Sequence, residues 1–201
     1  MANVTRQSAE DVSNQLTAIW NNFYNGTKTL ESYADVMTAL GAATASSSSE
    51  IATGLEKFAA IADTVGLSYN YAATALATVT AETRQSADIV GTAFKTLFAR
   101  VQDLDLGKTL EDGVTLGKYA QSLETIGVHV LDANGKLKDM NTILDDMGSK
   151  WKNIDDATKV AVAQAVGGTR QYTQLIALMD NWDKFQANLT VANTSEGTLQ
   201  E

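Results

Sequence analysis

The sequence predicts an all-α fold of helical hairpins or a helix bundle, with one small β-hairpin near residues 128–138. Three observations predict it. The chain has no proline in 201 residues, and proline strongly breaks helix interiors. Apolar residues recur three and four positions apart along most of the chain, which is typical of amphipathic helices. Only residues 128–137 alternate instead, around Asn134-Gly135, a dipeptide that favours a hairpin turn.

We expect residues 1–106 to form a helical repeat region. Ser47 and Glu50 have the spacing of a capping box, and Ser68 is placed to cap the following helix. Phe94 and Phe98 belong to a broad apolar stripe, which needs a partner surface to pack against. The helices predicted in this region span about 5–24, 28–40, 48–65, 68–80 and 83–104.

Residues 107–201 are predicted to form a second helical region, which contains the β-hairpin at 128–138. A long C-terminal helix is expected over about 169–190, where Trp182 lies in a strong apolar stripe. Trp151 ends the stripe of a shorter helix that begins near Met140. The chain ends in a polar stretch, so we expect it to be a fragment of a longer protein.

The tripeptide Thr-Arg-Gln occurs at 5–7, 83–85 and 169–171, each time before an apolar-periodic segment. The first two copies share Thr-Arg-Gln-Ser-Ala, which suggests a degenerate internal repeat. If each Thr is an N-cap, each Arg lies in a first turn, where the helix dipole disfavours a cation. One hypothesis is that these arginines bond to carboxylates or carbonyl ends of a neighbouring helix, within the chain or in another. The alternative is a solvated side chain. The candidate residues here are Arg6, Arg84, Gln85, Thr169, Arg170 and Gln171.

Composition argues against several function classes. The net charge is −9 and the 15 Lys and Arg are scattered, so no specific nucleic-acid binding is predicted. The absence of cysteine excludes disulfides, thiolate zinc sites and cysteine nucleophiles. No apolar run is long enough to predict a transmembrane segment.

No catalytic, cofactor-binding or metal-binding residues emerge, and we expect no enzyme. His129 is the only histidine and is expected to face solvent. The sequence Asp132–Gly135 is similar to part of a calcium loop, but both ends of the loop are missing. The acidic pairs at 145–146 and 155–156 are adjacent and do not face each other on a helix. The sequence at 167–170 lacks the spacing of a phosphate-binding loop, and a helix end followed by a cap explains it better.

Ten short segments resemble the core region of phage tail tape measure proteins, and the resemblance runs in order over almost the whole chain. They are Glu50-Ile-Ala, Leu55-Glu-Lys-Phe-Ala-Ala, Gly66-Leu-Ser-Tyr with Ala77-Thr-Val-Thr, Thr83-Arg-Gln-Ser-Ala, Phe94-Lys-Thr-Leu-Phe-Ala-Arg100, Gly127-Val-His-Val-Leu-Asp-Ala-Asn-Gly-Lys-Leu, Lys150-Trp151, Gly167-Gly-Thr-Arg-Gln171 and Ala177-Leu-Met-Asp-Asn-Trp182.

This resemblance implies a structural role. A tape measure protein occupies the tail lumen, sets tail length during assembly, and leaves with or ahead of the DNA at infection. The resemblance also implies homo-oligomerisation and contacts with tail-tube, tail-tip and assembly-chaperone proteins. The implied location is the virion, and the host cytoplasm during assembly.

Two other classes stay open at this point. A helical protein-interaction, effector or pore-forming module is one, although a pore-former would need a long apolar hairpin that the sequence lacks. An enzyme is the other, and it would need a cluster of polar residues. The 14 glycines and several helix caps further predict a folded module, since they interrupt every helix within about 25 residues.

Overall fold

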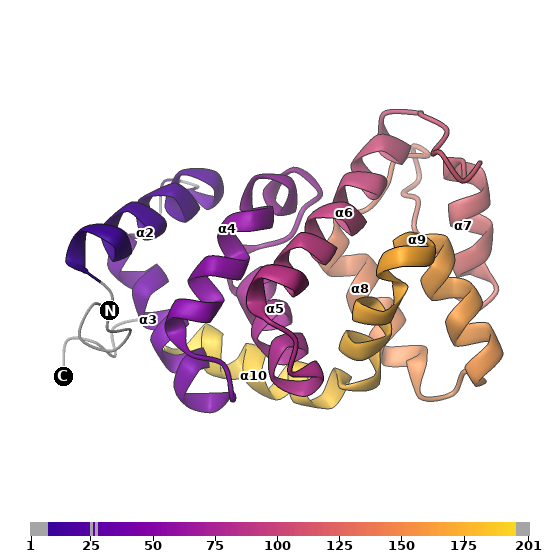
Figure 1. The fold of residues 1–201 in the computed structure, drawn as a ribbon. Helices are drawn as coiled ribbons and strands as arrows, with labels where there is room; N and C mark the ends of the chain where they lie inside the picture. The colour runs from indigo at the N-terminus through magenta and orange to yellow at the C-terminus, as the bar shows by residue number, and fades with distance from the viewer. Residues whose placement is uncertain (1–7, 25, 27, 196–201) are drawn as a thin grey trace.

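The computed structural model describes residues 8–24, 26 and 28–195, and this part of the chain is all-α (Figure 1). It contains nine helices and no β-strand in those ranges, which confirms the predicted class. The helices are α2 (Ala9–Phe23), α3 (Leu30–Ala43), α4 (Ser48–Thr64), α5 (Tyr69–Thr83), α6 (Ala87–Asp105), α7 (Leu116–Glu124), α8 (Met140–Trp151), α9 (Asp156–Asp180) and α10 (Trp182–Thr194).

Helix α5 is the centre of the core. Every residue from Tyr69 to Thr80 is buried, and most of them are Ala or Thr. Small side chains let α3, α4, α6, α9 and α10 approach α5 closely, so they pack around it. Helix α10 runs back along α3 and α5, which places the C-terminal helix beside the N-terminal half of the chain (Figure 1).

Helices α4 and α6 cross at a pair of glycines. A Cβ atom on Gly91 would lie 2.3 Å from the carbonyl oxygen of Gly54, so the two backbones touch. Beside this crossing, Phe58 of α4 packs against Phe94 and Phe98 of α6, with ring centroids 5.4 and 6.0 Å away. The apolar stripe predicted for α6 therefore finds its partner in α4.

Serine, and not threonine, starts the helices that follow the Thr-Arg-Gln-Ser-Ala segments. The side chain of Ser8 accepts a hydrogen bond from the backbone of Asp11, and Ser86 accepts one from Ile89. The prediction that Thr83 caps a helix over 83–104 is wrong. Thr83 is the last residue of α5, and its hydroxyl bonds back to Val79 instead. The shared pentapeptide thus marks two equivalent helix starts, three residues later than expected.

Other helix boundaries follow the local signals. The Ser47–Glu50 capping box is present, and Ser68 and Asp155 are N-caps. The helix predicted over about 28–40 was expected to end before Gly41, but α3 continues through this glycine to Ala43. The glycine serves close packing there, because a Cβ atom would lie 2.9 Å from the backbone nitrogen of Ser48.

The predicted long helix at 169–190 is not continuous. Gly168 (φ 71°, ψ 172°) bends α9 sharply, and Asn181 (φ −106°, ψ 29°) separates α9 from α10. The bend brings Lys159 and Asp180, at opposite ends of α9, within 3.7 Å of each other. We call residues 156–167 the first arm of α9 and residues 169–180 its second arm. Figure 1 shows the two arms turning back on each other.

The predicted β-hairpin at 128–138 is also wrong. Only an isolated antiparallel bridge joins Leu131 and Leu137, and the segment continues directly into α8. Gly135 does have the expected positive φ, 76°. The turn lies one residue earlier than predicted, because the Asp132 carboxylate accepts from the backbone nitrogens of Asn134 and Lys136 at 2.8 and 3.0 Å. A two-stranded ribbon this short has little stability of its own.

Two exposed aspartates make acid stability testable. Backbone hydrogen bonds lower the pKa of Asp132, and hydrogen bonds from Thr158 lower the pKa of Asp155. A lowered folded-state pKa stabilises the protein above the unfolded value of about 3.9, and this contribution is lost as pH falls through the lower folded value. We expect the double variant Asp132→Asn/Asp155→Asn to lose less stability than wild type below about pH 4. Thermal unfolding followed by circular dichroism from pH 6 to pH 3 measures this. A difference in melting temperature between wild type and variant that stays constant over this pH range would contradict the prediction.

Candidate functional site

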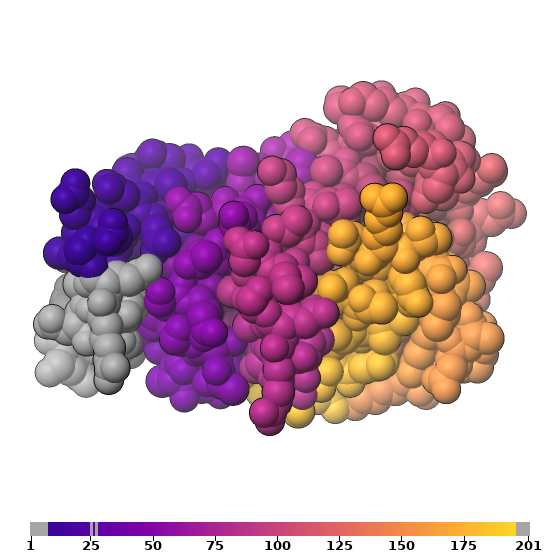
Figure 2. All heavy atoms as spheres, viewed as in Figure 1, coloured from indigo at the N-terminus to yellow at the C-terminus, as the bar shows by residue number. Residues whose placement is uncertain are grey.

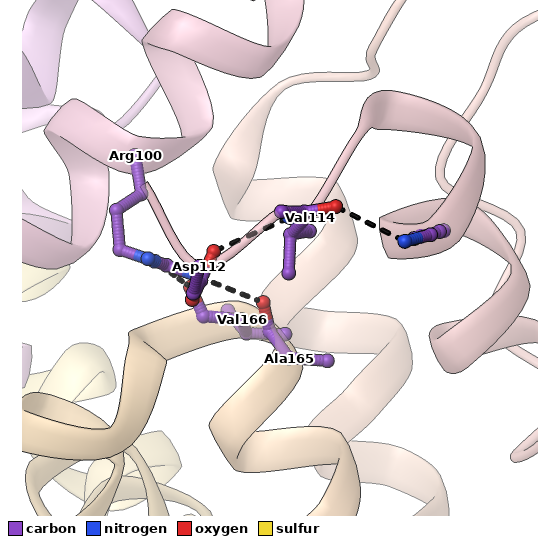
Figure 3. A network of polar contacts seen from close by, with 7 residues as sticks. Arg100, Asp112, Val114, Ala165 and Val166 are labelled. Carbon is purple, nitrogen blue, oxygen red and sulfur yellow. Dashed lines mark hydrogen bonds and ion pairs between the residues drawn. The ribbon is translucent and has the colours of Figure 1, made fainter. Parts of the chain in front are cut away.

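Arg100 joins three separate segments of the chain (Figure 3). From α6, its Nη2 forms an ion pair with Oδ2 of Asp112 at 2.8 Å. Its Nε donates to the carbonyl of Val166 at 3.3 Å, and Nη2 approaches the carbonyl of Ala165 at 3.5 Å. The Arg100 side chain is only 16% exposed, so these contacts form in a partly dry environment where charged hydrogen bonds are stronger.

The bend at Gly168 leaves helix carbonyls that need hydrogen-bond donors, and Arg100 supplies them. In a straight α-helix, the carbonyls of Ala165 and Val166 would accept from the backbone nitrogens of Thr169 and Arg170. Gly168 is not helical, so the first arm of α9 ends here and the guanidinium caps its carbonyls. The glycine also makes room, since a Cβ atom on Gly168 would lie 3.1 Å from Nη1 of Arg100.

Asp112 is positioned by the loop between α6 and α7. Its other oxygen, Oδ1, accepts from the backbone nitrogen of Val114 at 3.3 Å (Figure 3). The carbonyl of Val114 in turn accepts from the backbone nitrogen of Leu110 at 2.9 Å, and Lys118 donates to the carbonyl of Gly113. The loop therefore presents a carboxylate to Arg100 in a defined place.

The sequence did not single out Arg100, although it contained one usable signal. The hypothesis that an arginine bonds to carboxylates and carbonyl ends of a neighbouring helix describes Arg100 well, but it was made for Arg6, Arg84 and Arg170. Gly167-Gly168 predicted a helix end, and a buried helix end requires hydrogen-bond donors. Which donor supplies them depends on the α6–α9 contact, which the sequence does not show.

The Thr-Arg-Gln residues are placed as follows. The side chains of Arg84 and Arg170 are exposed and form no hydrogen bond or ion pair with the described residues, so the intermolecular form of the hypothesis stays a prediction. Arg84 has positive φ (56°) where α5 ends. Thr169 is exposed and Gln171 half-buried, whereas Gln85 accepts from Gln174 of the second arm of α9 at 3.1 Å. Arg6 lies outside the described residues.

The predicted aromatic residues are all in the core. Phe94, Phe98 and Trp151 are at most 2% exposed and Trp182 is 7% exposed, so the expectation that Phe94 and Trp182 are core residues is confirmed. Trp151 donates from Nε1 to Asp180 at 2.7 Å. The Trp182 ring stacks on Phe185 at 4.7 Å. These side chains hold helices together and do not line a binding site.

The titratable residues that the structure describes do not gather into a reactive group. His129 is 68% exposed, as expected, and its nearest acidic partner is Glu124 at 3.5 Å. Burial raises the pKa of Asp145, although the hydrogen bond that its carboxylate accepts from the Tyr71 hydroxyl opposes this shift. Within the described ranges, no group of three or more His, Cys, Asp or Glu could hold a metal ion. A shallow hollow of about 400 Å³ lies between α7 and α9, lined by Ser122, Thr125, Ala157, Thr158, Ala161 and Val162.

The fold and these contacts define a class of protein. It is an all-α protein whose polar side chains cap helix ends and join neighbouring helices. In the part of the chain that the structure describes, no helix combines the length and apolarity needed to cross a bilayer.

Comparison with known proteins identifies the family of this chain. The family model described as phage-related minor tail protein matches residues 1–168, so the chain belongs to this family. Family membership supports a structural role in the phage tail, contact with other tail proteins, and a location in the virion. The match ends at Gly168, the residue at which α9 bends. No solved structure matches the chain.

Proposed function

We propose that this chain is a segment of a tape measure protein, which organises tail assembly, determines tail length and occupies the tail lumen until DNA ejection. The observation that carries the proposal is the family match over residues 1–168, within which most of the tape-measure-like segments lie. In this proposal the protein acts as a homo-oligomer. It contacts tail-tube, tail-tip and assembly-chaperone proteins, and it is present in the host cytoplasm during assembly. It has no catalytic role.

Within the tape measure, we assign this segment to a folded module. We do not assign it to the ruler, which is the part whose extended length would determine the length of the tail. A ruler in helical form adds about 1.5 Å per residue, so 201 residues in one helix would span roughly 300 Å. Among the described residues, the longest helix without an internal break is α6, with 19 residues, and α9 folds back on itself. Such a module would nucleate assembly or position the tail tip.

An in-frame deletion of the whole segment in the phage tests this assignment. We expect failed or aberrant tail assembly, because contacts with tail proteins are lost. Tails shortened in proportion to the deleted residues would show that the segment is ruler after all. A matched control is Gly91→Ala, which disturbs the α4–α6 contact without changing the chain length. If tail assembly depends on the folded structure of this segment, Gly91→Ala should give the same assembly defect as the deletion.

Two further outcomes would favour the alternatives. Tails of normal number and length after the deletion would point to a helical interaction or effector module unrelated to tail assembly. Hydrolase activity of the purified chain that is abolished by His129→Ala would point to an enzyme.

A further inference from the structure

The C-terminal part of the chain docks on the rest as a separate arm. We call residues 169–195 the C-terminal arm; it comprises the second arm of α9 and all of α10. The arm contributes six apolar side chains to the core, which are Leu175, Leu178, Met179, Trp182, Phe185 and Ala192. Its polar contacts reach α5 and the residues that follow it: Gln174 bonds to Gln85, Lys184 to Glu82, Asn188 to Thr78 and Asn193 to Asn70. A surface held partly by amide and ionic contacts can be exposed to water at lower cost than one that is wholly apolar.

The arm is connected to the body through a single non-helical residue. Of the 25 residues of α9, only Gly168 departs from helical geometry, and its neighbour is also glycine. Both glycines can adopt helical geometry without a steric barrier. A straight α9 of 25 residues would be about 37 Å long and would carry the arm away from its own body.

The polar groups at the hinge can be satisfied in both conformations. In the bent form, Arg100 donates to the carbonyls of Ala165 and Val166. In a straight α9, the backbone nitrogens of Thr169 and Arg170 would supply those hydrogen bonds, and Arg100 would keep Asp112 as its partner. Straightening therefore leaves no buried carbonyl without a donor.

We propose that the C-terminal arm is exchangeable, and that a second copy of this chain accepts it through a straightened α9. A second copy is the matching partner, because it carries the same docking surface on α3, α5 and α8. All contacts between arm and body are then remade between chains, so the exchange breaks none of the core permanently. The bend at Gly168 and the cap from Arg100 favour the closed monomer. The end of the family match at Gly168 coincides with the hinge. This proposal does not depend on the tail-length role.

Hinge variants test the exchange. Alanine at position 168 disfavours φ near 71° and favours a helix, so Gly168→Ala should favour the exchanged dimer at least about tenfold. Arg100→Ala should shift the equilibrium in the same direction, because it leaves the two carbonyls without a donor only in the bent form. Light scattering after refolding at high concentration measures this as a mass near 43 kDa, twice the 21.4 kDa of one chain. The controls are Gly117→Ala and Lys95→Ala, which lie at exposed sites away from the hinge.

Cross-linking distinguishes arm exchange from ordinary association. The chain has no cysteine, so single thiols can be introduced at Glu82 and Lys184, whose side chains pair at 2.7 Å. Glu82→Cys and Lys184→Cys chains, each also carrying Gly168→Ala, are refolded together and treated with a short bis-maleimide. We expect a covalent dimer that combines one chain of each kind.

Three outcomes would overturn the proposal. The first is that Gly168→Ala and Arg100→Ala both fold as monomers at every concentration. The second is a dimer without a cross-link between positions 82 and 184. The third is loss of folding in both variants, which would show that the bend is an obligatory part of the fold.

Discussion

Gly91→Ala is expected to cause a large loss of stability, although it adds only one methyl group. The added Cβ atom would lie 2.3 Å from the carbonyl oxygen of Gly54, whereas ordinary van der Waals contact begins near 3.4 Å. The obstacle is backbone in the middle of a helix, so no side-chain rotation can relieve it. The helices must move apart, and Phe58 and Phe94 then lose their contact.

We expect Gly91→Ala to cost more than about 3 kcal/mol, which is at the upper end of overpacking effects. For a chain of this size that corresponds to a fall in melting temperature of roughly 6–12 °C or more. Thermal unfolding followed by circular dichroism measures it. Gly117→Ala is the control, because that exposed glycine of α7 has its nearest neighbour atom at 4.0 Å, and it should leave the melting temperature unchanged or slightly higher. Equal melting temperatures for the two variants would show that the crossing is not as close as described.

Trp182→Ala is expected to have the second large effect, at about 3–5 kcal/mol. Trp182 is 7% exposed, stacks on Phe185, and lies directly against the backbone of Gly148 in α8. The same substitution at Trp20, which is only partly buried, should cost clearly less. Urea unfolding at equilibrium gives both free energies. Similar losses at the two tryptophans would mean that Trp182 does not anchor the core.

The contact between Trp182 and Gly148 can be tested with a double-mutant cycle. A Cβ atom on Gly148 would lie 2.0 Å from Cε2 of Trp182, so Gly148→Ala alone should be strongly destabilising. Once Trp182 is truncated, that clash is gone. The double variant should therefore be more stable than the sum of the two single losses predicts, by at least about 1 kcal/mol. Strict additivity would contradict this contact.

These glycines show where prediction from sequence reaches its limit. In the sequence, glycine appeared only as a helix breaker, and that role is correct at Gly66 and Gly168, where φ is positive. Gly54, Gly91 and Gly148 lie inside helices, and each is needed because another part of the chain lies against it. That neighbour is distant in sequence, so no local pattern indicates it.

The candidate site was likewise only partly predictable from the sequence. The break at Gly167-Gly168 was visible in the sequence, but the donor that caps it, Arg100, comes from another helix. The arginines that the Thr-Arg-Gln pattern singled out, Arg84 and Arg170, make no such contact with the described residues. The alternation at 128–137 was real, yet it gives one bridge and not a hairpin, because a two-stranded ribbon this short has little stability of its own. The Asp132 side chain also sets the turn one residue earlier.

By itself, the sequence determined the helical class, several helix starts and the buried face of helices such as α6. These depend on groups within one turn of each other, such as the Ser47–Glu50 capping box or the Phe94–Phe98 stripe. Only the tertiary structure decided which helices pair, where α9 folds back and which arginine caps it. Those features depend on contacts between residues far apart in the chain, such as Arg100 with Val166 and Gly91 with Gly54, whose energy exists only once the helices have packed.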